Sequence, residues 1–308
     1  MKDSQKFKKL CSEFDKHLNI FKNSKIYKEL IDYFNAIDLF STLNEKKVTT
    51  TSDINPPTTH HSLLQIKCLG IGSISSNKLN SIYQLILIKT IFQDNFKINN
   101  ENIYLYDPAF TDLDIYFIKN HLNYSILKEK SSNILSNIIY YMPHIPIDVF
   151  EKIIIENKPI LMLTNDISLY NLKFTKSEFY NKFPNLSKLG NLLDTLEIKI
   201  NTNTSTNTST SDTSDNTSKD DFQIVTKKKS KKRQNKYILK ENNEINYSEI
   251  KESIYYNNLK TFKRFENGNN INEIWQDSFS HMCYYELNLA DPILKTNSPK
   301  SSSPTLHM

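Results

Sequence analysis

The sequence predicts an α/β fold: an open, doubly wound, mostly parallel Rossmann-like sheet with N-terminal helices and a disordered insertion. Short apolar runs alternate with helical segments between residues 63 and 172, and this alternation implies parallel strands joined by crossovers. The apolar runs are nearly continuous, as expected of strands that are buried on both faces. Glycines and prolines stand at the ends of these segments rather than inside them, which supports the same division.

The N-terminal residues 1–44 predict helices that pack on the core. Apolar side chains recur three or four residues apart in two groups. The groups are Leu10, Phe14, Leu18 and Phe21, then Ile26, Leu30, Tyr33 and Phe34. Residues 45–62 are polar and contain Pro56 and Pro57, so we expect a linker loop.

Residues 63–200 predict the Rossmann-like core. Strands are expected at 66–69, 103–106, 124–127, 138–142 and 160–164, and helices at 79–92, 113–121 and 146–156. The helix at 79–92 is apolar on most sides, which is typical of a helix covered by its neighbours. Pro146 suits the first turn of its helix.

Residues 201–236 predict a disordered insertion. The first part is a tract of Asn, Thr and Ser, which cannot bury enough apolar surface to offset the entropy of ordering. A run of lysines and one arginine follows at 227–233. We expect residues 237–292 to complete the core, with a helix or strand within 272–287 that docks on the sheet. The tail, 293–308, is expected to be flexible.

Composition narrows the class of protein. The formal net charge is +5, and much of the excess lies in the run at 227–233, so nucleic acid is not the expected partner. The cysteines, Cys11, Cys68 and Cys283, are far apart and odd in number. They predict neither a disulfide framework nor a zinc module. With no signal-peptide pattern and no long apolar run, we expect an intracellular protein, in the cytoplasm and as a candidate also in the nucleus.

Gly70-Ile71-Gly72 after the first strand is the first candidate ligand site. Two glycines let the backbone approach a phosphate, and the following helix N-terminus favours negative charge. A dinucleotide loop has a third glycine three residues on, where this chain has Ser75. Both a ligand-binding loop and a purely structural turn therefore stay open.

The ends of the later strands supply the other candidates. Asp107 could accept hydrogen bonds from a ribose or an amine, or it could cap the turn before Pro108. His144 could carry a proton as a catalytic residue, or serve as a hydrogen-bonded part of the scaffold. Asn165 follows the neighbouring strand. No second histidine or cysteine has ligand spacing, so no metal site is predicted, and the cofactor is unknown.

Three stretches resemble one family. They are residues 68–88, 103–127 and 138–166, which contain the glycine turn, Tyr106-Asp107-Pro108 and Tyr141-Met142-Pro143-His144. Their order and spacing are similar to the sensitivity-to-red-light-reduced-like (SRR-like) family. The chain departs from the family pattern at Ile145 and at Thr164-Asn165-Asp166.

The resemblance implies an intracellular regulatory protein, with a candidate part in a circadian clock input pathway, and implies no defined reaction. We then expect the protein to bind protein partners, whose identity is unknown, and not to associate with a membrane. Two alternatives remain. One is an enzyme or sensor that binds a nucleotide or cofactor in the strand-end crevice, the crevice at the carboxyl ends of the parallel strands. The other is a nuclear adaptor that acts through the basic run.

Overall fold

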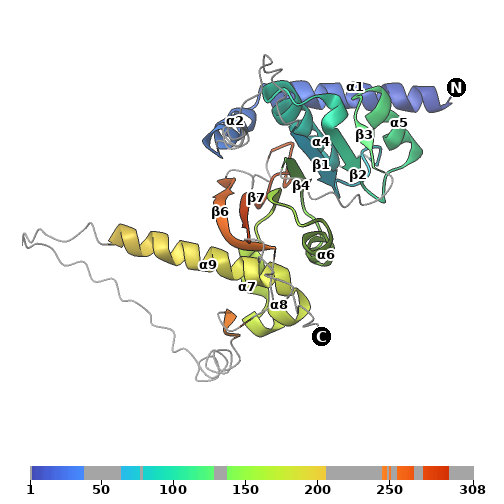
Figure 1. The fold of residues 1–308 in the computed structure, drawn as a ribbon. Coiled ribbons are helices and arrows are strands. Elements are labelled where there is room, and N and C mark those ends of the chain that lie inside the picture. Colours follow the sequence, from blue (N-terminus) through green and yellow to red (C-terminus); the bar gives the residue numbers. More distant parts are fainter. Residues whose placement is uncertain are drawn as a thin grey trace, which may run out of the picture.

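The protein is described by a computed structural model that covers residues 2–37, 64–76, 79–127, 137–205, 245–247, 250, 255–266 and 273–290. A seven-stranded sheet in the order β3-β2-β1-β4-β5-β7-β6 forms its centre (Figure 1). Five neighbouring strands are parallel: β1 (Gln65–Leu69), β2 (Ile103–Tyr106), β3 (Ser125–Ile126), β4 (Ile138–Met142) and β5 (Leu161–Asn165). The predicted parallel α/β sheet is therefore confirmed.

Two antiparallel strands extend the sheet beyond β5. β7 (Met282–Leu289) pairs with β5, and β6 (Tyr256–Arg264) pairs with β7 at the outer edge. The segment predicted at 272–287 as a helix or strand thus contributes β7. β6 was not predicted, because its asparagines and lysines give no continuous apolar run, as is usual for an edge strand.

Helices cover both faces of the sheet. One apolar cluster joins α1 (Lys2–Lys22), α2 (Lys25–Ile37), α4 (Leu79–Leu87) and α5 (Asp112–Asn120) to side chains such as Ile66 and Tyr141. The second cluster joins α6 (Ile147–Asn157), α8 (Lys176–Lys182) and α9 (Pro184–Ser205) to side chains such as Tyr140 and Met142. Neighbouring residues of β4 enter different clusters, as expected of alternate sides of a strand.

The connecting elements differ from the sequence expectation in detail. The helix predicted at 79–92 is α4 followed by a π-helical turn, η2 (Ile88–Asn95). A short 3-10 turn, η3 (Asn100–Asn102), precedes β2, and α7 (Ser168–Lys173) follows β5. The two helices predicted before residue 44 are confirmed as α1 and α2.

α9 continues to Ser205, so it overlaps the start of the insertion predicted at 201–236, whose bounds stay a prediction. The Asn/Thr run directly extends a leucine-rich helix, and a helix that is already nucleated can continue into residues of low propensity. The predicted linker, the basic run and the predicted tail lie outside the described residues. Within the described residues, no helix is both long and apolar enough to cross a membrane.

Candidate functional site

The carboxyl ends of the parallel strands meet at one edge of the sheet. The chain reverses its direction of winding between β1 and β4, which are neighbours although β2 and β3 lie between them in sequence. Open α/β sheets bind ligands at such a switch point. The glycine turn after β1 and His144 after β4 both lie there. Asp107 directly follows the flanking strand β2, and Asn165 is the last residue of the flanking strand β5.

The glycine turn directs its backbone donors at the protein itself. The Gly72 N–H donates to Asp107 Oδ2 at 2.7 Å, and the Gly70 N–H donates to the Tyr106 carbonyl at 3.2 Å. Both glycines have positive φ, +80° for Gly70 and +77° for Gly72, which side chains with a Cβ adopt poorly. A Cβ on Gly72 would also lie 3.0 Å from Ser81 Oγ on α4. The turn is therefore required for the close packing of α4.

Asp114 closes the second half of this loop. It is fully buried in the first turn of α5. Its carboxylate accepts from the Ser75 N–H at 2.6 Å, the Ser73 hydroxyl at 2.7 Å and the Thr111 N–H at 2.8 Å. Burial by itself opposes ionisation, yet these hydrogen bonds outweigh it and lower the pKa of Asp114 below its ordinary value.

The sequence carried one signal for Asp114 that was not used. Thr111 and Asp114 form a reciprocal capping box at the start of α5, the pattern that marks helix N-termini. As a result, Ser75 is not an open phosphate ligand in this structure. Its N–H is bound by Asp114, and its hydroxyl lies 3.0 Å from the hydroxyl of Thr111.

His144 and Asn165 occupy the other side of the switch point. His144 is exposed, has φ +51°, and places Nε2 2.9 Å from the carbonyl of Asp277. Because a carbonyl can only accept, Nε2 carries the hydrogen in this contact. Asn165 donates from Nδ2 to the Ile145 carbonyl at 3.0 Å. Both predicted residues thus hold the loop after β4 in place.

The segment 273–281 lies across the switch point. Asn80, at the start of α4, donates to Asp277 Oδ1 at 2.6 Å and accepts from the Ser278 hydroxyl at 3.2 Å. The segment is anchored by Trp275 and Phe279, which are 7% and 1% exposed within the first apolar cluster. It therefore bridges α4 and the loop after β4 at the position where open sheets receive ligands.

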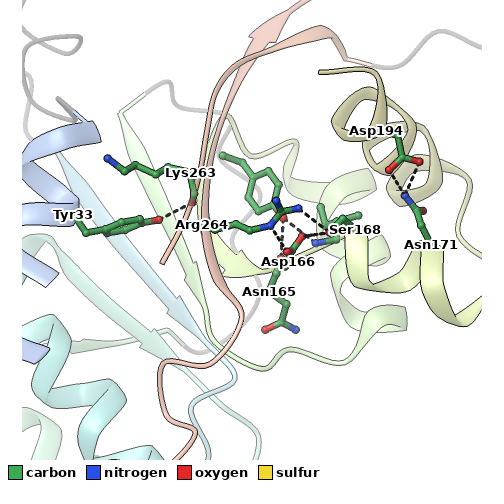
Figure 2. A network of polar contacts seen from close by, with 10 residues as sticks. Tyr33, Asn165, Asp166, Ser168, Asn171, Asp194, Lys263 and Arg264 are labelled. Carbon is green, nitrogen blue, oxygen red and sulfur yellow. Dashed lines mark hydrogen bonds and ion pairs between the residues drawn. The ribbon is translucent and has the colours of Figure 1, made fainter. Parts of the chain in front are cut away.

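A partly buried ion pair connects the end of β5 to β6. Figure 2 shows Arg264 reaching Asp166 and Ser168. Arg264 Nε donates to Asp166 Oδ2 at 2.6 Å, and the second oxygen of Asp166 accepts from the Ser168 hydroxyl at 2.7 Å. The Asp166 N–H donates to the carbonyl of His281 at 2.8 Å. Arg264 was not predicted from the sequence, since it lies far along the chain in an unpredicted strand.

The thiols show no sign of activation. Burial raises the pKa of Cys68, and the nearby Asp107 raises it further. Burial likewise raises the pKa of Cys11 and of Cys283. Thiolates, not thiols, are the nucleophiles. Among the described residues, no group of three or more His, Cys, Asp or Glu side chains could hold a metal ion.

The fold and the strand-end loops define a Rossmann-like α/β domain with a glycine turn at its switch point. The model of the SRR1 domain matches residues 39–286. The chain therefore belongs to the SRR1 domain family, which confirms the resemblance seen in the sequence. No curated protein and no solved structure matches the chain significantly. The match begins after α2, so the two N-terminal helices lie outside it.

Proposed function

We propose that this SRR1-domain protein is an intracellular regulator that works through protein partners and not by catalysis at the strand-end crevice. One observation carries the proposal. The donors that a phosphate would need, the N–H groups of Gly72 and Ser75, are bound to the carboxylates of Asp107 and Asp114. A phosphate placed there would meet two negative charges in place of open donors.

The segment 273–281 supports the same proposal. Its acceptors meet the side-chain donors of Asn80 and His144, so a ligand would have to displace it. Displacement would expose Trp275 and Phe279, and large apolar side chains stabilise by about 1.5–3 kcal/mol each when buried. From the family resemblance we also propose that the protein acts in the cytoplasm and nucleus. We propose input to a circadian clock as the process that it regulates.

Thermal unfolding with a nucleotide panel tests the proposal. We expect NAD, NADP, ATP, GTP and S-adenosylmethionine at millimolar concentration to leave the Tm of the full chain unchanged. A ligand at 100 times its Kd would stabilise by about 2.7 kcal/mol and raise the Tm by several degrees. The matched variant is Asp107→Asn, which keeps the size of the side chain. A rise in Tm with any nucleotide that Asp107→Asn abolishes would favour the alternative of a nucleotide-binding enzyme or sensor.

The basic run at 227–233 carries the second alternative, a nuclear adaptor. It lies outside the described residues, so the prediction rests on the sequence. Deleting 227–233 from a fluorescent fusion is expected to remove nuclear accumulation while the cytoplasmic signal remains. The control is deletion of residues 211–217, a stretch of equal length in the predicted insertion that contains aspartates but no lysine or arginine. Salt-dependent binding to nucleic acid that disappears with 227–233 would favour the adaptor.

A further inference from the structure

A buried histidine lies where α1 packs against α4 (Figure 1). His17 of α1 is 7% exposed, and its Nδ1 lies 2.9 Å from the hydroxyl of Tyr83, a fully buried residue of α4. The two rings also meet edge to face, with their centroids 5.3 Å apart. Histidine is the side chain that ordinarily changes its charge close to physiological pH. The contact between α1 and α4 therefore contains a group that can respond to a small change in pH.

The surroundings of His17 favour its neutral form. Burial lowers the pKa of His17 below its ordinary value of 6.5. In the described part of the chain, the charges that act on the ring are those of Glu13 and Lys16 on α1, and they oppose each other. α4 carries no charged residue between Leu79 and Leu87. The hydroxyl of Tyr83 could still accept from a protonated ring, but no carboxylate of α4 would offset the buried charge.

The charged side chains on the other elements around α1 have partners of their own or face solvent. The pairs are Asp94 with Lys22 and Lys89, His121 with Asp15, and Glu29 with Lys25. The exposed groups are Lys28, Asp32, Asp112, Lys119, Glu273 and Asp277. A protonated His17 would thus gain no anionic partner from these elements while it stays in the core.

Tyr83 connects His17 to the segment 273–281. The rings of Tyr83 and Trp275 meet edge to face, with their centroids 6.4 Å apart. Trp275 is buried, and its indole N–H has no hydrogen-bond partner among the described residues. Packing against neighbours such as Tyr83 therefore holds the indole ring in place. A change at His17 reaches the segment that lies across the switch point through one intervening side chain.

We propose that His17 is a proton-sensitive switch that couples α1 to the segment 273–281. Near neutral pH the uncharged ring stays between α1 and α4 and supports Tyr83 against Trp275. On protonation the ring moves toward solvent, and Tyr83 and Trp275 repack. α1 itself stays attached through Phe14 and Phe21, which are fully buried. The switch does not depend on the proposed function, because it concerns how the protein responds to pH and not what it binds.

The pH range of the switch follows from the direction of the pKa shift. Since the pKa of His17 is lowered in the folded state, the unfolded chain takes up the proton more readily. The contribution of His17 to stability is complete above its unfolded pKa of about 6.5 and is lost as the pH falls from there through the lowered folded-state value. The effect of Asp114 begins only near its own unfolded pKa of about 3.9, so the two ranges are separate.

The fluorescence of Trp275, the single tryptophan, tests the switch in the full chain. We expect its emission to shift reversibly to longer wavelength as the pH is lowered from about 7.5 to about 5, with a midpoint below about 6.5. The far-UV circular dichroism should stay constant over this range. His17→Asn should abolish the shift, because its amide can bond the Tyr83 hydroxyl near the position of Nδ1 but cannot take up the proton.

His121→Asn is the matched control. His121 also contacts α1, through the ring of Phe14 and the carboxylate of Asp15, and its variant should retain the emission shift. His17→Gln is a second uncharged variant, which keeps the test valid where His17→Asn fails to fold. The Tm of the unmodified chain should fall between pH 7.5 and pH 5.5, and this fall should be smaller in His17→Gln.

Three results would overturn the proposal. One is a constant emission of Trp275 down to about pH 5. Another is a shift that persists in the His17 variants, or that His121→Asn removes equally. The third is a loss of circular dichroism at the same midpoint, which would show global unfolding in place of a local switch. A constant emission together with an unchanged Tm in the nucleotide panel removes the switch and leaves the regulatory proposal intact.

Discussion

A chain that begins at residue 39, where the family match begins, is expected not to fold into a stable domain. α1 and α2 precede the match, yet they supply part of the first apolar cluster. The side chains involved are 0–4% exposed: Leu10, Phe14, Phe21, Ile26, Leu30 and Phe34. At about 1.5–3 kcal/mol for each, their loss is on the order of 10 kcal/mol, similar to the whole stability of a domain.

The loss would also uncover α4. Tyr83 of α4 is fully buried, and its hydroxyl lies 2.9 Å from His17 Nδ1 on α1. Circular dichroism and thermal unfolding of residues 39–308 against the full chain measure the effect. The control is a chain that ends at 290, which keeps every residue of β7. Cooperative unfolding of 39–308 at the Tm of the full chain would show that the two helices are dispensable.

Asp114→Ala is expected to lower the free energy of unfolding by about 3–4 kcal/mol. The substitution removes the Asp114 half of the capping box of α5. It also leaves the partly buried Ser75 N–H and Ser73 hydroxyl without their acceptor, at about 1–3 kcal/mol for each unsatisfied group. Urea unfolding followed by the single tryptophan, Trp275, reports the change. Asp112→Ala, in the same helical turn, should lose less than about 1 kcal/mol because it affects only the helix dipole. Equal losses in the two variants would contradict the assigned role.

Comparison of Asp114→Ala with the unmodified chain also makes the pH dependence of stability measurable. The folded-state pKa of Asp114 is lowered, so its ionised form stabilises the protein above the unfolded pKa of about 3.9. This stabilisation is lost as the pH falls through the lowered folded-state value. The difference in free energy of unfolding between the unmodified chain and Asp114→Ala should thus be largest near neutral pH and shrink below pH 4. If this difference in free energy of unfolding grew as the pH fell, it would contradict the assigned role of Asp114.

The parallel half of the sheet was predictable because its strands are continuous apolar runs ended by turn residues. β2 and β4 have the predicted bounds, 103–106 and 138–142. β6 and the helices α7 to α9 were not predicted. β6 mixes Asn, Lys and Thr, since an edge strand that pairs on one side needs little apolar surface. The apolar spacing of Leu186, Leu189 and Leu193, all buried, was present in α9 but not used.

The sequence was sufficient to predict where the candidate site lies but not which hydrogen bonds its residues make. The strand-end rule places the glycine turn, Asp107, His144 and Asn165 at one edge, where the structure also has them. The sequence could not show where their hydrogen bonds go. The pairing of Gly72 with Asp107 and of His144 with Asp277 depends on tertiary contacts between distant segments. Whether any of these residues binds a cofactor stays a prediction.

The position of β6 at the edge of the sheet bears on how the connection between α9 and β6 tolerates insertions. α9 ends at Ser205, and the next described strand, β6, starts at Tyr256 on the outer rim of the sheet. Each doubling of a flexible connection costs only about 0.6 kcal/mol of closure entropy. We therefore expect a reporter module inserted between α9 and β6 to leave the free energy of unfolding nearly unchanged.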